Sequence, residues 1–449
     1  MRRAVVLLAM IGLPGEALAN GRPPSTNGVT FHPTDVHSIY VRSTFGLLVS
    51  KDDGCSFRWV CEKAIGYGGE FDPKYAVATD GTVFATTFEG LRVSRDGGCT
   101  WATATAEAAA GPGKISDIWI DALDIAADGT VWVATAESAR PNDVFSSSDN
   151  GVTFAPRGQA SATIWWKSVK TARSNPQRVY LTGYQVAGTL PDGGQAPPTA
   201  HLRRSDDGGA TWIPLELFGE RPDPPTIKFG ATPIVLIAAV DPKTPDTLLL
   251  TSLGANGSQG DRLYRSTDAG FSFTEVLATT DAIRDTVFAQ DGAVYVATPA
   301  GSFRSTDNGA TFAPLAGSPQ LACLGQLGDG KLVGCGANWE PDFKAVAVSS
   351  DSTTWSKQFR FVELAGPLQC DAGTTVATAC DPLWPSLQQQ FGATGPNTCG
   401  VLPDTTLPEP PAKEPGGCCD ASHSGVPITA FVFAAGWLAL LRRRRRCCD

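Results

Sequence analysis

The chain has 449 residues, of which 42% are hydrophobic and 18% are charged, and its formal net charge is −9. An apolar fraction of this size can fill a substantial core, while the acidic balance lacks the basic surface that binds nucleic acids. We therefore expect no nucleic-acid partner. The 48 glycines and 33 prolines favour many short strands and tight turns over long helices.

The chain begins with the three parts of a secretion signal, in their usual order. Met1, Arg2 and Arg3 form a charged start, residues 4–13 form an apolar core, and Ala17-Leu18-Ala19 is a small-x-small cleavage site. Residues 1–19 are therefore predicted to be a signal peptide, and the alternative is an ordinary first strand. Export predicts an oxidising compartment for the mature chain.

An eight-residue pattern, S-x-D-x-G-x-[TS]-[WF], recurs along the chain, and we call each copy an octet. Its clearest copy is residues 305–312, and the six full copies begin at Ser50, Ser94, Ser147, Ser205, Ser266 and Ser305. A seventh copy, residues 349–355, is one residue short and has lost its glycine. Successive copies start 44, 53, 58, 61, 39 and 44 residues apart, and this period indicates a repeat architecture.

Each octet is predicted to form a tight turn between two strands. Its carboxylate can accept hydrogen bonds from backbone N–H groups just beyond it, and its glycine allows a positive φ. Its final aromatic residue can fill the layer between neighbouring sheets. A structural role therefore accounts for the octet aspartates, which are Asp52, Asp96, Asp149, Asp207, Asp268, Asp307 and Asp351.

The octets resemble the Asp-box, or BNR repeat, of sialidases, sortilin-type receptors and photosystem assembly factors. The resemblance covers about residues 28–362. It implies a propeller fold and no particular activity, because those families share the turn and not the chemistry.

A second pattern precedes the octets: an Asp-Gly pair flanked by apolar β-forming residues, as in residues 80–87, 128–135 and 291–298. This pair is a strong hairpin signal. Each repeat then consists of strand, Asp-Gly turn, strand, loop, strand, octet and strand. The predicted fold is all-β, a seven-bladed β-propeller of four-stranded antiparallel blades over residues 20–365. How its ring closes is left open, because no spare strand is evident.

The loop lengths distinguish the two faces of such a propeller. The connections between strands 1 and 2 and between strands 3 and 4 share one face, the octet face, and are short. The connections between strands 2 and 3 and between successive blades share the other, the long-loop face, with insertions at residues 137–143, 184–201, 218–230, 254–261 and 339–343. Long loops on a rigid scaffold favour a binding site, and neutral drift of surface loops is the alternative.

Aromatic residues on or beside these loops are the candidate ligand-binding residues. They are Trp339, Phe343, Tyr184, Trp165 and Trp166. A large ring gains contact area with little loss of entropy, which suits contact with a sugar or a protein. Trp165 and Trp166 begin a strand, so burial between blades is the simpler expectation for them.

Eight of the twelve cysteines precede the C-terminal tail, which favours disulfides in an exported chain. Cys323 and Cys335 flank a Gly-Asp-Gly turn symmetrically and are predicted to pair, and Cys370 and Cys380 flank a short loop and are expected to pair as well. Cys55, Cys61, Cys99 and Cys399 stay unassigned. A bond from Cys399 to one of the other three would tie a disulfide-bonded extension, residues 366–400, to blade 1 or 2.

A zinc site is the competing interpretation of these cysteines, although no C-x-x-C pair or nearby histidine supports it. We expect no metal and no cofactor. Within the extension, residues 384–391 are expected to form a short helix.

The tail contains a Pro-rich linker, residues 401–417, and then a segment of residues 418–449. This segment has Cys418 and Cys419, an apolar run at 426–441, and arginines at 442–446. Their order resembles the C-terminal sorting signals of myxobacteria and similar Gram-negative bacteria. The resemblance implies a membrane helix before processing, cleavage by a protease at Cys418 or Cys419, and display at the cell surface or outer membrane. The trailing Cys447-Cys448-Asp449 departs from the pattern, and a plain single-span anchor is the alternative.

Sialidases share this repeat, so an enzymatic function has to be considered. Their Phe-Arg-Ile-Pro motif is absent here, and Arg204, Arg265 and Arg304 each precede an octet, away from the long-loop face. We therefore expect a secreted or surface-displayed, non-catalytic propeller that binds a glycan or a surface protein. The alternative is a sialidase-like or other glycoside hydrolase, which needs two facing carboxylates that no motif marks.

Overall fold

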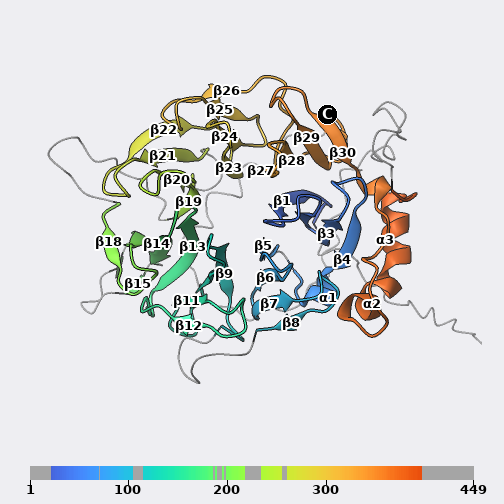
Figure 1. Ribbon diagram of the computed structural model, residues 1–449, viewed down its shortest axis with the longest axis horizontal. Helices are drawn as coiled ribbons and strands as arrows, with labels where there is room; N and C mark the ends of the chain where they lie inside the picture. The colour runs from blue at the N-terminus through green and yellow to red at the C-terminus, as the bar shows by residue number, and fades with distance from the viewer. Residues whose placement is uncertain are drawn as a thin grey trace, which may run out of the picture. The chain divides into compact units, whose positions relative to one another are not determined.

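The computed structural model describes residues 22–396, except 70, 105–114, 186–187, 190–194, 197–198, 218–233 and 255–259. Seven four-stranded antiparallel sheets form a ring (Figure 1), and residues of their first strands line a central channel. The predicted seven-bladed β-propeller is therefore confirmed. The signal peptide, the Pro-rich linker and the sorting segment, with Cys399, Cys418 and Cys419, lie outside the described residues.

The first four blades take up the chain to residue 215. Blade 1 consists of β1 (Thr26–Phe31), β2 (Ile39–Ser43), β3 (Gly46–Ser50) and β4 (Arg58–Cys61). Blade 2 consists of β5 (Tyr75–Val77), β6 (Val83–Thr87), β7 (Gly90–Ser94) and β8 (Ala102–Thr103). Blade 3 consists of β9 (Ile120–Ile125), β10 (Val131–Thr135), β11 (Val144–Ser147) and β12 (Ala155–Pro156). Blade 4 consists of β13 (Ile164–Ala172), β14 (Asn175–Gln185), β17 (Thr199–Ser205) and β18 (Ile213–Leu215).

The other three blades follow in chain order. Blade 5 consists of β19 (Val235–Val240), β20 (Leu248–Ser252), β21 (Arg262–Ser266) and β22 (Thr274–Ala278). Blade 6 consists of β23 (Asp285–Phe288), β24 (Val294–Ala297), β25 (Phe303–Ser305) and β26 (Ala313–Pro314). Blade 7 consists of β27 (Cys323–Gln326), β28 (Leu332–Cys335), β29 (Val346–Ser349) and β30 (Ser356–Phe359).

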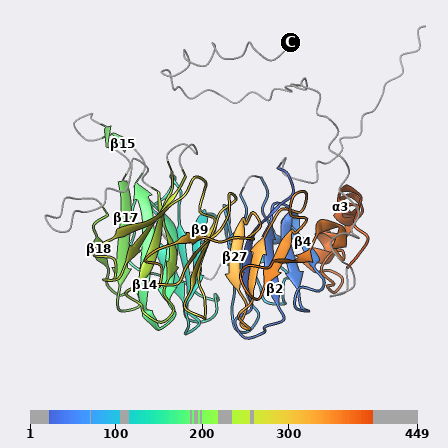
Figure 2. The same ribbon diagram turned by 90° about the horizontal axis from the view of Figure 1, so that it is seen from above.

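Within each blade the strands pair in chain order, and the first strand lies nearest the channel (Figure 1). A separate hairpin, β15 (Gly188–Thr189) with β16 (Gln195–Ala196), extends the connection between β14 and β17. Figure 2 shows β15 above the ring, on the long-loop face. The two faces of the propeller are thus distinguished by the loops that they carry.

The octets form the turns between the third and fourth strands. In octet 305–312, the amide of Thr311 donates to Asp307 Oδ1 at 2.9 Å, and its hydroxyl donates to Oδ2 at 2.6 Å. Hydrogen bonds from Ser305 and Thr311 hold the pKa of Asp307 far below its usual range. Gly309, at φ 80°, takes the left-handed conformation expected of it.

The octet serine has a role that the sequence analysis missed. Ser305 Oγ donates to Asp307 at 2.7 Å and accepts from the amide of Gly309 at 2.8 Å, so it links the two ends of the turn. The same pair of bonds forms in the other five full copies. In the seventh copy, which lacks the glycine, Ser349 Oγ still donates to Asp351 at 3.1 Å, and Asp351 also accepts from the amides of Thr353 and Thr354.

The last and first blades meet without exchanging a strand, since all four strands of each come from its own repeat. At this junction the hydroxyl of Thr26 donates to the carbonyl oxygen of Ala345 at 2.6 Å. Gly325 lies so close to Phe31 that a Cβ there would come within 2.7 Å of the ring. The contact between blades 1 and 7 is therefore close, but it contains no shared sheet.

The segment after blade 7 crosses this junction, and we call residues 361–396 the clasp. It contains η2 (Phe361–Glu363), α2 (Thr375–Ala379), η3 (Asp381–Leu383) and α3 (Trp384–Phe391), the last of which is the expected helix. Pro367 forms a parallel bridge with Trp59 of β4, and Leu368 N donates to the Trp59 carbonyl at 2.8 Å. The clasp thus pairs with the outer edge of blade 1, where Figure 1 shows α2 and α3.

Two disulfides fix the clasp, and their pairing corrects the prediction. Cys380 is bonded to Cys61 of blade 1, and Cys370 is bonded to Cys99 of blade 2. The expected Cys370–Cys380 pair is wrong because the residues between them include α2, which docks on the blades and turns the two sulfurs to different partners. Cys323 and Cys335 face each other in β27 and β28 and are bonded, as expected.

Cys55 is also disulfide-bonded. These seven cysteines therefore have no thiolate to offer zinc.

We expect the two clasp disulfides to stabilise the closed ring more than the hairpin disulfide does. They span 319 and 271 residues, whereas Cys323–Cys335 spans 12, and a disulfide that closes a longer loop restricts the unfolded chain more. Cys61→Ser with Cys380→Ser should lower the free energy of unfolding by about 2–4 kcal/mol. Thermal and urea unfolding would measure this. A larger loss from Cys323→Ser with Cys335→Ser would contradict it.

Candidate functional site

The long-loop face carries a row of five aromatic side chains across blades 2, 3 and 4, which we call the aromatic strip. Its members are Phe71, Phe88, Trp119, Trp165 and Tyr184. The ring centroids of Phe71 and Phe88 lie 4.8 Å apart, those of Phe88 and Trp119 4.8 Å, those of Trp119 and Trp165 6.0 Å, and those of Trp165 and Tyr184 5.9 Å. Each ring therefore contacts the next, and the row is continuous.

The blade repeat explains why these rings meet. Phe88 directly follows β6 and Tyr184 is the penultimate residue of β14, so both stand where a second strand reaches the long-loop face. Trp119 directly precedes β9, where a first strand leaves that face, and Trp165 pairs with Tyr184 across β13 and β14. Phe88 is 50% exposed and the other four rings are half-buried, so the strip offers apolar surface on a fixed base.

Two of the five predicted ligand-binding residues, Trp165 and Tyr184, belong to this strip. Trp166 does not: it is 1% exposed, packs in the core between blades 3 and 4, and donates its indole N–H to the Gln159 carbonyl at 3.0 Å. Its assignment to a binding site is wrong, because adjacent residues of a strand face opposite ways and Trp166 faces the core.

Trp339 and Phe343 lie in blade 7 and do not join the strip. Trp339 is half-buried, with its ring 6.4 Å from that of Phe361. The guanidinium of Arg360 lies 5.0 Å from the centre of the Phe343 ring. Trp339 and Phe343 both lie in the connection between β28 and β29, outside the strip.

An ion cluster around one buried carboxylate borders the strip on the channel side. Asp121 of β9 forms ion pairs with Lys74, at 3.3 Å, and with Lys167. Lys74 Nζ also donates to the carbonyl oxygens of Asp121, at 2.5 Å, and Lys167, at 3.2 Å, and burial lowers its pKa. Lys167 Nζ lies 4.8 Å from the centre of the Trp119 ring. The cluster joins three blades and holds Trp119 in place.

Two carboxyl groups lie at the blade 2 end of the strip. Asp72, next to Phe71, accepts hydrogen bonds from Arg22 at 2.6 and 2.9 Å and from Asn27 at 2.6 Å. Burial raises the pKa of Glu62 to about 7; the negative charge of Asp72 adds to this shift and the Arg22 charge opposes it. The two carboxyl groups thus have different electrostatic surroundings.

The arginines before the octets form contacts between neighbouring turns. Arg204 donates to the carbonyl of Ala269 at 2.9 Å, Arg265 donates to that of Asn308 at 2.8 Å, and Arg304 lies 3.9 Å from Asp291. They lie near the octets, as predicted. Their contacts connect turns on the octet face.

The sequence analysis missed Phe71, Phe88 and Trp119. Phe88 and Trp119 directly flank the strands Val83–Thr87 and Ile120–Ile125, whereas Phe71 lies in the loop before β5. Comparing the residues that directly flank the first and second strands of all blades would have brought out Phe88 and Trp119.

Among the described residues there is no group of three or more His, Cys, Asp or Glu side chains that could hold a metal ion. The same part of the chain contains no helix long and apolar enough to cross a membrane.

Comparison with known proteins supports the propeller fold, the class that the seven blades define. No family model matches the chain. A xyloglucanase of Hypocrea jecorina (strain QM6a) is 28% identical over 219 residues, which cover 42% of this chain and 25% of the xyloglucanase. The crystal structure of an ancestral GH74 enzyme matches at 15% identity with a TM-score of 0.51, over 76% of this chain and 47% of that one. YCF48 from Cyanidioschyzon merolae matches at 13% identity with a TM-score of 0.46, over 72% of this chain and 94% of that one. The chain thus spans a quarter of the xyloglucanase and less than half of the GH74 enzyme.

Proposed function

We propose that this protein is a non-catalytic, glycan-binding β-propeller and that the aromatic strip is its binding surface. The observation that carries the proposal is the continuous row of five rings on one face of a rigid ring. The partial sequence similarity to a xyloglucanase, an enzyme named for its polysaccharide, supports the choice of ligand class.

The strip and its border suit the two surfaces of a sugar ring. An aromatic ring offers a large apolar face at little cost in entropy, and the C–H face of a sugar can pack on it. Lys74, Asp121 and Lys167 lie beside the strip with N–H groups and carboxylate oxygens, the kinds of group that bond sugar hydroxyls. Because three blades hold the rings, an extended oligosaccharide would meet a surface that is already in its bound form.

Phe88→Ala should weaken glycan binding by about tenfold, or ~1.4 kcal/mol, because it removes the most exposed ring of the strip. A glycan array probed with the purified propeller would identify the ligand. Titration calorimetry would then give the affinity of that ligand for the natural protein and for Phe88→Ala. Phe271→Ala is the matched control, since Phe271 is 44% exposed on the octet face. Equal losses from the two changes, or binding of proteins and not of glycans, would contradict the proposal.

Glycoside hydrolysis is the second candidate, favoured by the carboxyl pair beside the strip. A glycosidase uses one carboxyl group as an acid and another as an ionised base or nucleophile. Glu62, with its pKa raised to about 7, fits the first role, and Asp72, in an ion pair with Arg22, fits the second.

If this chain hydrolyses glycans, its rate should fall as the pH rises through about 7, because Glu62 then loses the proton that an acid catalyst must give. Glu62→Gln should abolish turnover and keep binding, whereas Glu275→Gln on the outer strand β22 should leave both turnover and binding unchanged. Product analysis after incubation with the array-selected glycan measures this. Binding without any turnover by the natural protein would leave the non-catalytic proposal standing.

We also propose that the propeller is exported and displayed at the cell surface, on the evidence of residues 1–19 and 401–449 of the sequence. The intact mass of the protein extracted from the surface tests this. We expect a chain that begins at Asn20 and ends near Cys418, without arginines 442–446. A mass that includes those arginines would show a membrane anchor instead.

A further inference from the structure

The central channel contains two hollows, of about 460 and 580 Å³. Both are lined by Asp124, Lys170, Arg173 and Val287, so they meet inside the channel. The larger hollow is also lined by turns between first and second strands, including Pro33, Thr79, Gly129 and Gly328. It therefore lies toward the octet face, at the opposite end of the channel from the aromatic strip.

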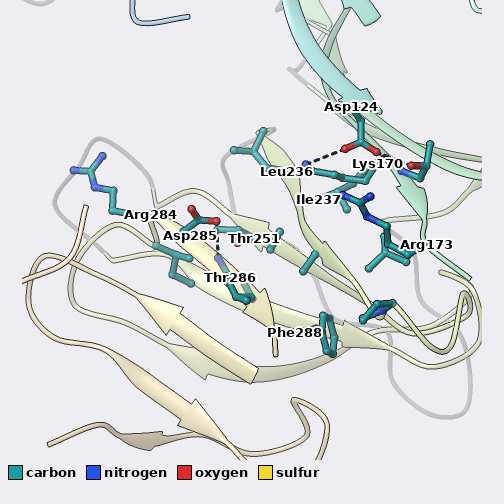
Figure 3. A pocket seen from close by; sticks show the side chains of 17 residues that line it. Asp124, Lys170, Arg173, Leu236, Ile237, Thr251, Arg284, Asp285, Thr286 and Phe288 are labelled. Carbon is teal, nitrogen blue, oxygen red and sulfur yellow. Dashed lines mark hydrogen bonds and ion pairs between the residues drawn. The ribbon is translucent and has the colours of Figure 1, made fainter. Parts of the chain in front are cut away.

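Asp124 is the one carboxylate that lines both hollows, and each of its two oxygens already has a partner. Asp124 Oδ2 accepts from the amide of Thr171 at 2.8 Å and from its hydroxyl at 2.7 Å, and Oδ1 lies 3.3 Å from Lys170 Nζ. Figure 3 shows Asp124 and Lys170 with Arg173 beside them. One negative charge thus faces two positive ones, in a chain whose net charge is −9.

Arg173 lines both hollows but does not take part in the ion pair between Asp124 and Lys170. It follows β13 directly, in the turn that leads to β14, and its side chain is exposed. No hydrogen bond or ion pair joins its guanidinium to another of the described residues, whereas Lys170 shares the charge of Asp124. A positive charge at the wall of a cleft raises the local concentration of anions.

His32 also lines the larger hollow and adds a hydrogen-bond donor. Its Nδ1 accepts from the amides of Thr34, at 3.2 Å, and Asp35, at 2.9 Å. In the neutral ring the proton therefore sits on Nε2, which can donate to a ligand. In the smaller hollow the remaining carboxyl is Asp285, which accepts from the amides of Leu324 and Thr286 and whose pKa is raised by burial.

We propose that the octet-face end of the channel is a binding site for a small organic carboxylate. The planar guanidinium of Arg173 matches a carboxylate in a two-point contact, and Lys170 adds charge. Val36, Val287 and Leu327 line the same hollow and give the carbon body of the ligand an apolar wall. A volume of about 580 Å³ is that of a typical small-molecule site. This site is separate from the strip and does not depend on its ligand.

Titration calorimetry with hexanoate and with neutral hexanamide tests the site, since the two differ in charge and hardly in shape. We expect hexanoate to bind and hexanamide to bind at least tenfold more weakly. Arg173→Gln should weaken hexanoate binding at least tenfold, and because Arg173 is exposed the variant should keep its melting temperature. Arg262→Gln is the matched control: it removes the same charge from the outer part of blade 5, where Arg262 is 52% exposed.

Three results would overturn the proposal. One is equal binding of hexanoate and hexanamide, or of neither. Another is an equal loss of affinity in Arg173→Gln and Arg262→Gln. The third is tight binding of inorganic phosphate with no binding of hexanoate, which would assign the site to a different anion. Phe88→Ala should leave hexanoate binding unchanged, which separates this site from the aromatic strip.

Discussion

A ring of seven separate sheets must be closed between its last and first blades, and this constraint shapes much of the chain outside the repeats. Blades 1 and 7 form separate sheets, so no strand of one blade pairs with a strand of the other at this junction. The clasp takes the place of such pairing: it adds a short parallel pairing to β4 and packs its Phe361 and Phe391 against Phe45 of blade 1. Its disulfides reach blades 1 and 2, so the clasp extends over two blades beyond the junction. A closed ring leaves no blade free to separate, which keeps loops of distant blades in register.

Because the ring is rigid, aromatic residues from different blades stay in contact and form one surface. The strip draws on blades 2, 3 and 4, and no two of its blades share a sheet. Between blades 2, 3 and 4, the ion cluster of Lys74, Asp121 and Lys167 replaces backbone pairing near the channel. A buried carboxylate with two ammonium partners is costly to break, because the loss of one lysine leaves charge without compensation in a low dielectric. The cluster therefore resists sliding of one blade against the next, and the rings above it keep their spacing.

The sequence was sufficient for the fold because the octet is local chemistry. Serine, aspartate and glycine of one turn bond one another, so each turn forms from eight adjacent residues whatever surrounds it. The hairpin disulfide Cys323–Cys335 was predictable for the same reason, since one Asp-Gly turn sets its register. The partners of Cys370 and Cys380 were not, because they lie 271 and 319 residues away and depend on where the clasp docks. Only Trp165 and Tyr184 of the strip were predicted. Its rings come from different repeats, and they are close together only because the ring closes. Trp165 and Trp166 could have been separated by strand alternation alone, once the face of either was known.

The two ends of the channel differ in chemistry, and this difference favours two ligands over one. At the long-loop end the charges are paired: Asp121 with two lysines, and Asp72 with Arg22. The rings of the strip add exposed apolar surface there, which selects by shape and contact and depends little on salt. At the octet end Arg173 carries a charge that the described residues leave unpaired, within walls that concentrate its field, so recognition there is electrostatic and falls with ionic strength. A neutral glycan would gain little from the octet end, and a small acid would gain little from the strip. The two proposed sites therefore call for different ligands and can be tested independently of each other.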